Sequence, residues 1–315
     1  MFLVLLINLL MGATFSIVKL ILDNYTDPIF LVGYRMTLAG IMLLGYQFLF
    51  RRNHFKIHTK ADLIAFIKVA LFHIYLCYIC EFWSQKYLAP AKVALLFNLT
   101  PFVTAGLSYL MHRQKQSFKK IIGLAIGFIG FLPILATHSP VETLTNNQLL
   151  GFLPELALLV AVVSAAYAWL IVEQLVIKRK YAILLVNGFA MFWGGILATF
   201  TSWIVGNYTG GSELGRAWDP WPFNDFGILT FWVLVLILLS NLIYYNVYAR
   251  LLHHYTPTFM AFSGLTIPLF AAMWEWLIFG IVISWPFWAS LIIISFGLGL
   301  YYREEIRLSH QNNLI

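Results

Sequence analysis

The stretch APAKVALLFNLTPF at residues 89–102 has a second copy in the chain, TPTFMAFSGLTIPLF at residues 256–270. At an offset of 167 residues, five residues of the first half meet an identical residue in the second: the pairs are Pro90 with Pro257, Ala94 with Ala261, Pro101 with Pro268, Ala105 with Ala272 and Gly130 with Gly297. Three coincidences of proline and glycine at one offset are not expected by chance. The pattern therefore indicates an internal repeat.

The composition places this repeat in a membrane. Hydrophobic residues make up 61% of the 315 residues and charged residues 10%, whereas a soluble domain has about 25% charged residues. A helix that crosses the ~30 Å hydrocarbon core needs about 20 apolar residues. Ten stretches meet this need, near residues 1–22, 28–50, 63–85, 90–111, 119–137, 149–175, 182–205, 226–249, 257–280 and 285–302.

These stretches predict an all-α integral membrane protein with ten transmembrane helices. In lipid every backbone polar group needs an internal partner, so a span is a helix or part of a closed barrel. Barrel strands would alternate in hydrophobicity over about 10 residues, and these runs are longer and uniformly apolar.

The distribution of Lys and Arg predicts the orientation. With the N-terminus inside, and with Lys119 and Lys120 at the edge of 112–118 included, the cytoplasmic segments carry fourteen of the twenty Lys and Arg residues and the external segments carry three. The cytoplasmic segments are 51–62, 112–118, 176–181, 250–256 and the residues after 302. Since basic residues favour the cytoplasmic side, we expect both termini there. Topology also accounts for the net charge of +7 without a nucleic-acid partner.

The repeat and the helix count together predict an inverted architecture. Five predicted helices separate the two copies, and because five is odd, the second half runs through the membrane upside down. We expect a first five-helix repeat at 1–137, an external linker at 138–148, a second, inverted repeat at 149–302 and a cytoplasmic tail at 303–315. Inverted repeats are typical of secondary transporters, whose binding site lies near the midplane.

Several features together are similar to one family. A small-residue helix reaches Pro101 before a further apolar run, and a G-x-x-x-G-x-x-G helix follows at Gly123, Gly127 and Gly130. With ten spans, this resembles the drug/metabolite transporter superfamily, in particular its EamA-type branch. The resemblance covers essentially the whole chain and is clearest at Ala91–Leu132 and Thr258–Leu300.

The resemblance implies a role for Arg35 and a class of substrates, and the chain departs from the family pattern at two positions. Arg35 in the second helix fits the family pattern. The family often has a Glu about thirteen residues after each repeated proline, and this chain has Gln114 and Ile281 there. The implied substrates are amino acids, related amine metabolites, nucleotide-like metabolites or drugs.

Charged residues inside predicted spans are candidate substrate ligands because they are costly in lipid. Arg35 lies about eight residues into the second helix, where its guanidinium would bind a carboxylate or phosphate bidentately or form an ion pair with Glu81. Glu81 would face a cationic group of the substrate, titrate as a coupling proton site, or pair with a neighbouring cation. Both alternatives stay open from the sequence.

Matching faces of the fourth and ninth helices supply two further candidates, Asn98 and Glu275. The first shares a helix face with Pro101 and the second with Pro268, at spacings of three and four residues. Proline frees a backbone carbonyl that can point into a cavity, so we expect both side chains to line one. The alternative is that these faces serve packing alone.

The remaining candidate ligands are Trp169, Asn187, Asn241 and Tyr245, whose rings and amides suit a flat or cationic substrate. His73 and Cys77 are spaced as a possible metal-binding pair, but other helices have no matching Cys or His cluster. No metal and no cofactor are expected.

The sequence thus predicts a secondary carrier that moves a small polar or amphipathic metabolite by alternating access. It has no P-loop, H-E-x-x-H or G-x-S-x-G motif, so neither an enzyme nor ATP-driven transport is expected. Protons or a counter-substrate are the candidate coupled species. The alternative is a membrane-embedded enzyme or translocator acting on a lipid-linked substrate. We expect a multi-pass protein of a bacterial inner membrane, as a monomer or homodimer.

Overall fold

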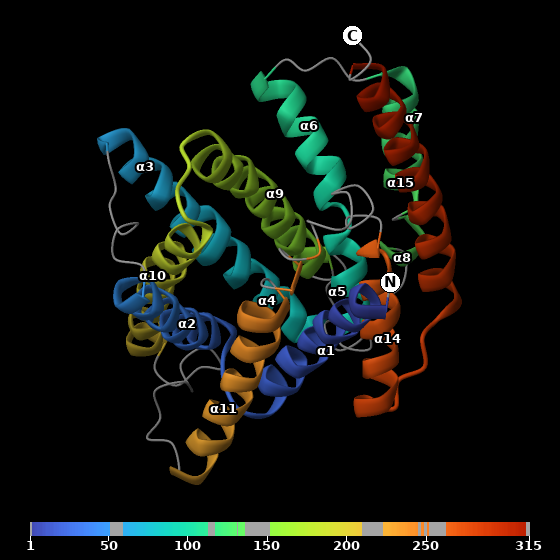
Figure 1. The fold of residues 1–315 in the computed structure, drawn as a ribbon. Helices are drawn as coiled ribbons and strands as arrows, with labels where there is room; N and C mark the ends of the chain where they lie inside the picture. Colours follow the sequence, from blue (N-terminus) through green and yellow to red (C-terminus); the bar gives the residue numbers. More distant parts are fainter. Residues whose placement is uncertain are drawn as a thin grey trace. The chain divides into compact units, whose positions relative to one another are not determined.

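The computed structural model describes residues 2–50, 59–112, 117–130, 132–135, 152–209, 223–244, 247–248, 251 and 263–312 (Figure 1). Within these ranges the helices are α1 Phe2–Asn24, α2 Pro28–Phe50, α3 Lys60–Val69, α4 Cys77–Tyr87, α5 Pro90–Phe97, α6 Thr100–His112, α7 Phe118–Ile129, α8 Leu132–Leu135, α9 Leu153–Glu173, α10 Ile183–Thr209, α11 Phe223–Leu236, α14 Thr266–Phe279 and α15 Trp285–Asn312. Three π-helical segments join or extend them: η2 Ala70–Leu76, η5 Gln174–Lys178 and η7 Ile237–Tyr244.

Seven of the helices in the described ranges are long and apolar enough to cross a membrane. They are Phe2–Asn24, Pro28–Phe50, Lys60–Tyr87, Leu153–Lys178, Ile183–Val205, Phe226–Tyr244 and Trp285–Glu304. The expected all-α membrane protein is thereby confirmed. Ten spans remain a prediction, because α5, α6, α7 and α14 are shorter and residues 257–262 of the predicted ninth helix lie outside the described residues.

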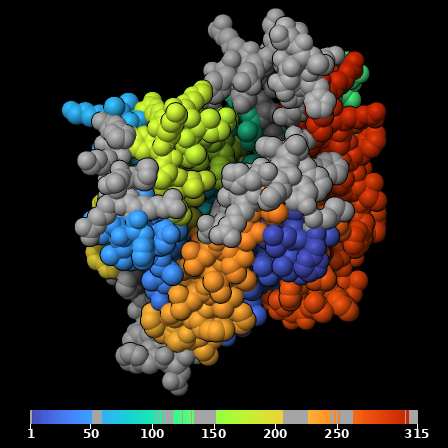
Figure 2. All heavy atoms as spheres, viewed as in Figure 1, coloured from blue at the N-terminus to red at the C-terminus, as the bar shows by residue number. Residues whose placement is uncertain are grey.

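The surface of α9 has the character expected of a helix that faces lipid. Large apolar side chains are exposed along one of its faces at spacings of three and four residues: Leu153, Leu156, Val160 and Val163. Figure 2 shows the yellow-green atoms of this region reaching the molecular surface. Its other face is buried and rich in alanine, with Ala161, Ala165 and Ala168 inside the protein.

The fourth predicted helix is not continuous, which corrects the expectation of one span over 90–111. A turn at Asn98–Leu99 separates α5 from α6, just before Pro101. Proline has no N–H and cannot donate to the carbonyl one turn back, and the Thr100 hydroxyl instead donates to the Phe97 carbonyl at 2.6 Å. At the start of α14 the Thr266 hydroxyl donates to the Ser263 carbonyl at 2.7 Å, and the Gly264 carbonyl, one turn before Pro268, accepts from the Ile267 N–H at 3.0 Å.

The chain forms two compact units, each of which combines segments from both halves of the sequence. Unit 1 contains Met1–Ile17, Tyr87–Glu155 and Leu238–Ile315; unit 2 contains Val18–Lys86 and Leu156–Ile237. Within unit 1, α5 packs on α14 and α7 packs on α15; within unit 2, α2 packs on α10. The pairs α2 with α10 and α7 with α15 each join a helix to the one that occupies the same place in the other half.

Glycines allow α2 and α10 to approach until their backbones touch. A Cβ added to Gly40 would lie 2.4 Å from the Phe192 nitrogen, and one added to Gly195 would lie 2.4 Å from the Thr37 nitrogen. At an offset of 155 residues, Gly40 of α2 corresponds to Gly195 of α10, and Thr37 corresponds to Phe192. Each glycine therefore contacts the counterpart of the residue that the other glycine contacts, so the two contacts are reciprocal. The same offset relates two further contacts, that of Gly33 with Thr199 and that of Gly188 with Leu44: Gly33 corresponds to Gly188, and Leu44 corresponds to Thr199.

The contact between α7 and α15 in unit 1 is reciprocal in the same way. A Cβ on Gly297 would lie 2.5 Å from the Gly127 nitrogen, and one on Gly130 would lie 2.9 Å from the Ile294 nitrogen. Gly130 with Gly297 and Gly127 with Ile294 are both 167 residues apart. Reciprocal contacts of this kind are the signature of a two-fold relationship between packed elements.

These contacts make a matched pair of substitutions informative. Gly40→Ala places a methyl group against the α10 backbone and should destabilise the protein by about 1–3 kcal/mol. Gly45→Ala lies in the same helix, but its added Cβ meets nothing within 4 Å, so it should leave the stability unchanged or raise it slightly. Thermal unfolding of both purified variants in one detergent measures the difference. Equal melting temperatures would contradict the packing described.

Candidate functional site

Arg35 lies in the middle of unit 2, where α2 faces α4. Its side chain is buried, with 4% of its surface exposed. The guanidinium carbon lies 5.8 Å from the centre of the Tyr78 ring and 5.7 Å from the centre of the Phe82 ring. Both distances fit cation–π contacts, which are strongest when desolvated. The two rings stand one turn apart on α4 and thereby hold the cation on one face of that helix.

Glu81 lies on α4 between these two aromatic residues and is also buried, with 8% exposed. Its carboxylate and the guanidinium of Arg35 interact electrostatically. The structure therefore brings together the two charged candidates that the sequence placed in separate helices. An anion and a cation that are buried together among aromatic rings suit a substrate that carries both charges.

His73 and Trp169 extend the aromatic wall. The two rings meet edge to face with centres 5.1 Å apart, and the His73 ring lies 6.4 Å from the Tyr78 ring. Trp169 on α9 keeps 37% of its surface exposed, so it is accessible to a bound molecule. We call Arg35, His73, Tyr78, Glu81, Phe82 and Trp169 the Arg35 cluster. Sequence reasoning missed Tyr78 and Phe82, although their spacing around Glu81 was visible.

Two of the three π-helical segments, η2 and η7, fall at corresponding places in the two halves. The segment η2 carries His73, and η7 carries Asn241. Adding 167 to residues 70–76 gives 237–243, which lie within η7. In unit 1 the buried Asn241 amide oxygen accepts a hydrogen bond from the Ser240 hydroxyl at 2.9 Å. π-helical turns are rare and concentrate at functional sites.

Polar side chains in unit 1 gather at the helix breaks. Asn98 occupies the turn between α5 and α6, and its amide nitrogen is buried with no hydrogen-bond partner in the described part of the chain. Asn8, which sequence reasoning missed, donates to the Ser263 carbonyl at 2.8 Å and to the Thr266 hydroxyl at 3.0 Å. It thereby ties α1 to the start of α14.

Glu275 has a partner that the sequence did not reveal. Its Oε2 accepts a hydrogen bond from the Ala91 N–H at 3.0 Å, and only 1% of the residue is exposed. Since Pro90 begins α5, the carboxylate of α14 caps the N-terminus of α5 and complements its dipole. This arrangement favours the packing alternative over cavity lining for Glu275.

A second buried charge pair was also missed. Lys92 Nζ lies 2.6 Å from Glu155 Oε1, and both side chains are almost fully enclosed. The sequence interpretation counted Lys92 as a charge of the external side. Each residue stands in the first turn of an apolar helix, α5 or α9, a pattern that could have suggested the pair.

The last two candidates do not join the cluster. Asn187 is half-buried in α10. The contacts of Gly33 with Thr199 and Gly40 with Phe192 show that α2 and α10 run antiparallel. They place Asn187 about ten residues, or about 15 Å, along this pair from Arg35. Tyr245 lies outside the described residues.

Comparison with known proteins agrees with this arrangement of helices. The model of the EamA-like transporter family matches two segments of the chain, residues 1–136 and 152–303. The chain belongs to the EamA-like transporter family. It is accordingly a membrane transporter of the drug/metabolite type and not an enzyme.

Relatives and a solved structure support the same assignment. The chain is 30% identical over 97% of its length to the S-adenosylmethionine/S-adenosylhomocysteine transporter of Chlamydia muridarum, of which it covers 92%. It is 27% identical, again over 97% of its length, to the protein of that name from Chlamydia trachomatis serovar L2, of which it covers 90%. A protein crystal structure with 13% identity matches 97% of both chains with a TM-score of 0.64, which shows the same fold.

The role of Glu275 can be tested on stability. Glu275→Leu removes the acceptor of a buried N–H and should destabilise the protein by about 1–3 kcal/mol. Glu275→Gln keeps an acceptor oxygen and should cost much less. Glu173→Leu, at an exposed carboxylate of α9, is the matched control and should be nearly neutral. If Glu275→Leu melts at the wild-type temperature, the capping role is wrong.

Proposed function

We propose that this chain is a secondary carrier for S-adenosylmethionine and S-adenosylhomocysteine. The observation that carries the proposal is the similarity to carriers of that name over 97% of the chain. The molecule is a nucleotide-like metabolite with an amino-acid end, so it belongs to the classes that the sequence resemblance implied.

The chemistry of the Arg35 cluster suits this substrate. The substrate's carboxylate would bind the guanidinium of Arg35 in a bidentate manner, and its ammonium group would face Glu81. The positive sulfonium and the flat adenine would lie against aromatic faces, for which Tyr78, Phe82 and Trp169 are placed. S-adenosylhomocysteine lacks the sulfonium charge but keeps the carboxylate, the amine and the adenine, so one site can accept both molecules.

Ten spans in two inverted five-helix halves are the architecture we infer. The 167-residue repeat, the reciprocal contacts of α2 with α10 and α7 with α15, and the matching π-helical segments support it. Interrupted helices at corresponding places in two halves mark binding sites in transporters of this kind. Here they are the break at Asn98–Leu99 and the start of α14 at Thr266.

Transport would proceed by alternating access, driven by exchange or by protons. We favour exchange, because the two named substrates of the relatives differ by one methyl group and can enter and leave through one site. The excess of Lys and Arg on one side supports cytoplasmic termini. The relatives are bacterial proteins, which supports a bacterial inner membrane.

Reconstituted liposomes test the substrate. Labelled S-adenosylmethionine should enter vesicles that contain the protein, and S-adenosylhomocysteine inside the vesicles should speed its entry. Unlabelled S-adenosylhomocysteine outside should compete, whereas methionine or adenosine alone should compete weakly because each lacks half of the contacts. Uptake no faster than in empty vesicles, with either compound inside, would refute the proposal.

Arg35 provides the sharpest prediction for the site. Arg35→Lys keeps the charge but loses the planar fork, and should raise KM about tenfold or more. Arg35→Ala should abolish uptake. Lys68→Gln removes an exposed intramembrane cation outside the Arg35 cluster and should leave KM unchanged. Initial rates in vesicles with equal amounts of protein measure all three.

The alternative role for Arg35 is a structural ion pair with Glu81. In that case the neutral double variant Arg35→Gln, Glu81→Gln should restore both expression and uptake, because it removes both buried charges together. If Arg35 binds substrate, the double variant should reach the membrane and remain inactive. Full uptake by the double variant would remove Arg35 from the substrate ligands.

A further inference from the structure

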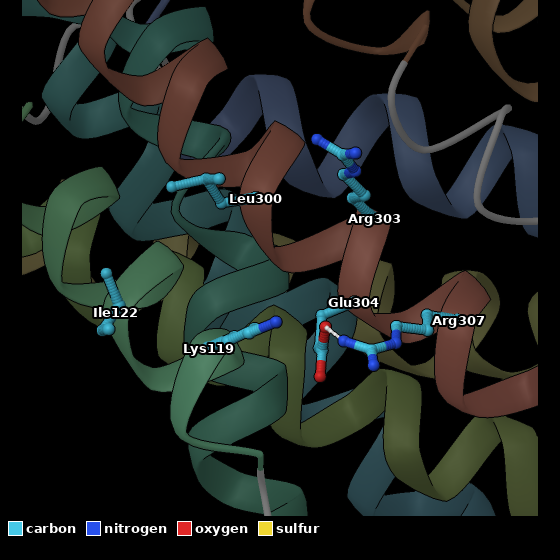
Figure 3. Close-up of a pocket in the computed structure, with 6 residues that line it drawn as sticks. All are labelled: Lys119, Ile122, Leu300, Arg303, Glu304 and Arg307. Carbon is cyan, nitrogen blue, oxygen red and sulfur yellow. Dashed lines mark ion pairs between the residues drawn. The ribbon is translucent and has the colours of Figure 1, made fainter.

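A cavity of about 730 Å³ lies in unit 1 where α7 begins and α15 approaches its end (Figure 3). It is lined by Lys119, Ile122, Leu300, Arg303, Glu304 and Arg307. None of these residues belongs to the Arg35 cluster. The cavity is therefore separate from the site proposed for the transported molecule.

The cavity is strongly basic. Lys119, Arg303 and Arg307 contribute three positive charges and Glu304 one negative charge, so the lining carries a net charge of +2. Glu304 is already engaged, because its Oε1 accepts from the Ser117 hydroxyl at 3.1 Å and its Oε2 lies 3.8 Å from Arg307. Figure 3 shows Lys119 extending from α7 toward α15. Lys119 of α7 and the two arginines of α15 thus line the same cavity.

The position of the cavity along α15 points to a lipid. The span Trp285–Glu304 ends where the cations stand, at the boundary between hydrocarbon and headgroups. Ile122 and Leu300 form the apolar part of the lining, about one turn deeper along their helices. Large apolar side chains continue this surface toward the membrane interior, with Ile121 50% and Phe296 61% exposed.

The start of α7 adds a further attraction for an anion. The helix begins at Phe118, and the Ser117 side chain makes no capping hydrogen bond to it. The first N–H groups of a helix and its dipole favour negative charge. Lys119 stands in this first turn, so the helix terminus and the side chain attract a negative group at the same place.

We propose that this cavity binds the phosphate headgroup of an anionic phospholipid, with the acyl chains lying against the apolar surface of α7 and α15. Basic pockets between transmembrane helices on the cytoplasmic side bind such headgroups, and the proposed topology places this cavity on that side. A soluble phosphate compound would use the cations but would gain nothing from the apolar lining. The proposal does not depend on which metabolite the protein carries.

The experiment measures lipid binding by the full chain in a neutral detergent. Phosphatidylglycerol should raise the melting temperature in a saturable manner and phosphatidylcholine should not. Lys119→Gln, Arg303→Gln, Arg307→Gln should largely abolish the rise, since each cation is expected to contribute about a fivefold change in affinity for an anionic headgroup. The matched control is Lys60→Gln, Lys178→Gln, Lys180→Gln, which removes three exposed cations from unit 2. It should keep the full rise.

Three results would overturn the proposal. A rise of equal size in the cavity variant and the wild type would place the lipid elsewhere, and an equal loss in the control variant would show a general surface effect. If glycerol 3-phosphate reproduces the rise at similar concentration, the ligand is a soluble phosphate.

Two further variants apply if the triple glutamine variant of the cavity fails to fold. The variant Lys119→Arg, Arg303→Lys, Arg307→Lys retains the charge and should keep the rise, and Arg303→Gln alone should weaken binding about fivefold. Unchanged binding by that single variant would count against the site.

Discussion

Backbone contact at glycine is the interaction on which the rest of the structure depends. Because lipid tails are as apolar as the helix surfaces, the hydrophobic effect does not favour association of two apolar helices in a membrane. Such helices associate through close packing instead. Among the described residues, close backbone approaches join α2 to α10 at Gly40 and Gly195, and α7 to α15 at Gly127 and Gly297. Each contact pairs a helix with its counterpart from the other half. Corresponding helices of an inverted repeat present similar surfaces. Where such a surface is complementary to its own copy, the two corresponding helices can pack on each other.

This scaffold leaves other helices free to be irregular. The turn at Asn98–Leu99, the late start of α14 and the segments η2 and η7 depart from regular α-helix, and they carry two of the polar candidates, Asn98 and Asn241. Buried groups nearby satisfy the exposed backbone: Asn8 binds the Ser263 carbonyl, and Glu275 binds the Ala91 N–H. In the carrier we propose, the closely packed helix α2 also carries Arg35, so one of the tight pairs positions a substrate ligand as well.

The sequence predicted the helices well because hydropathy and length report directly on contact with lipid. It also selected Arg35 and Glu81 as candidate ligands, because a charged residue inside a span is costly in lipid; their role in binding stays a prediction. It missed the break at Asn98 because Thr100 and Pro101 act through local hydrogen bonds that hydropathy does not record. It could not reveal the partners of Glu275 and Lys92, because Ala91 and Glu155 lie on other helices. Tyr78 and Phe82 went unnoticed because aromatic residues are common in this chain and only the fold shows which ones meet Arg35.

The inverted relationship between the halves is the central claim, and labelling of one residue pair tests it most directly. Ser117 and Ser284 are 167 residues apart and stand immediately before α7 and α15. Single cysteines at these positions, in a background with Cys77 and Cys80 replaced, should react with a membrane-impermeant maleimide from opposite sides of the membrane. The account predicts that Ser117→Cys reacts only from the cytoplasm and Ser284→Cys only from outside. Labelling of both from the same side would contradict it.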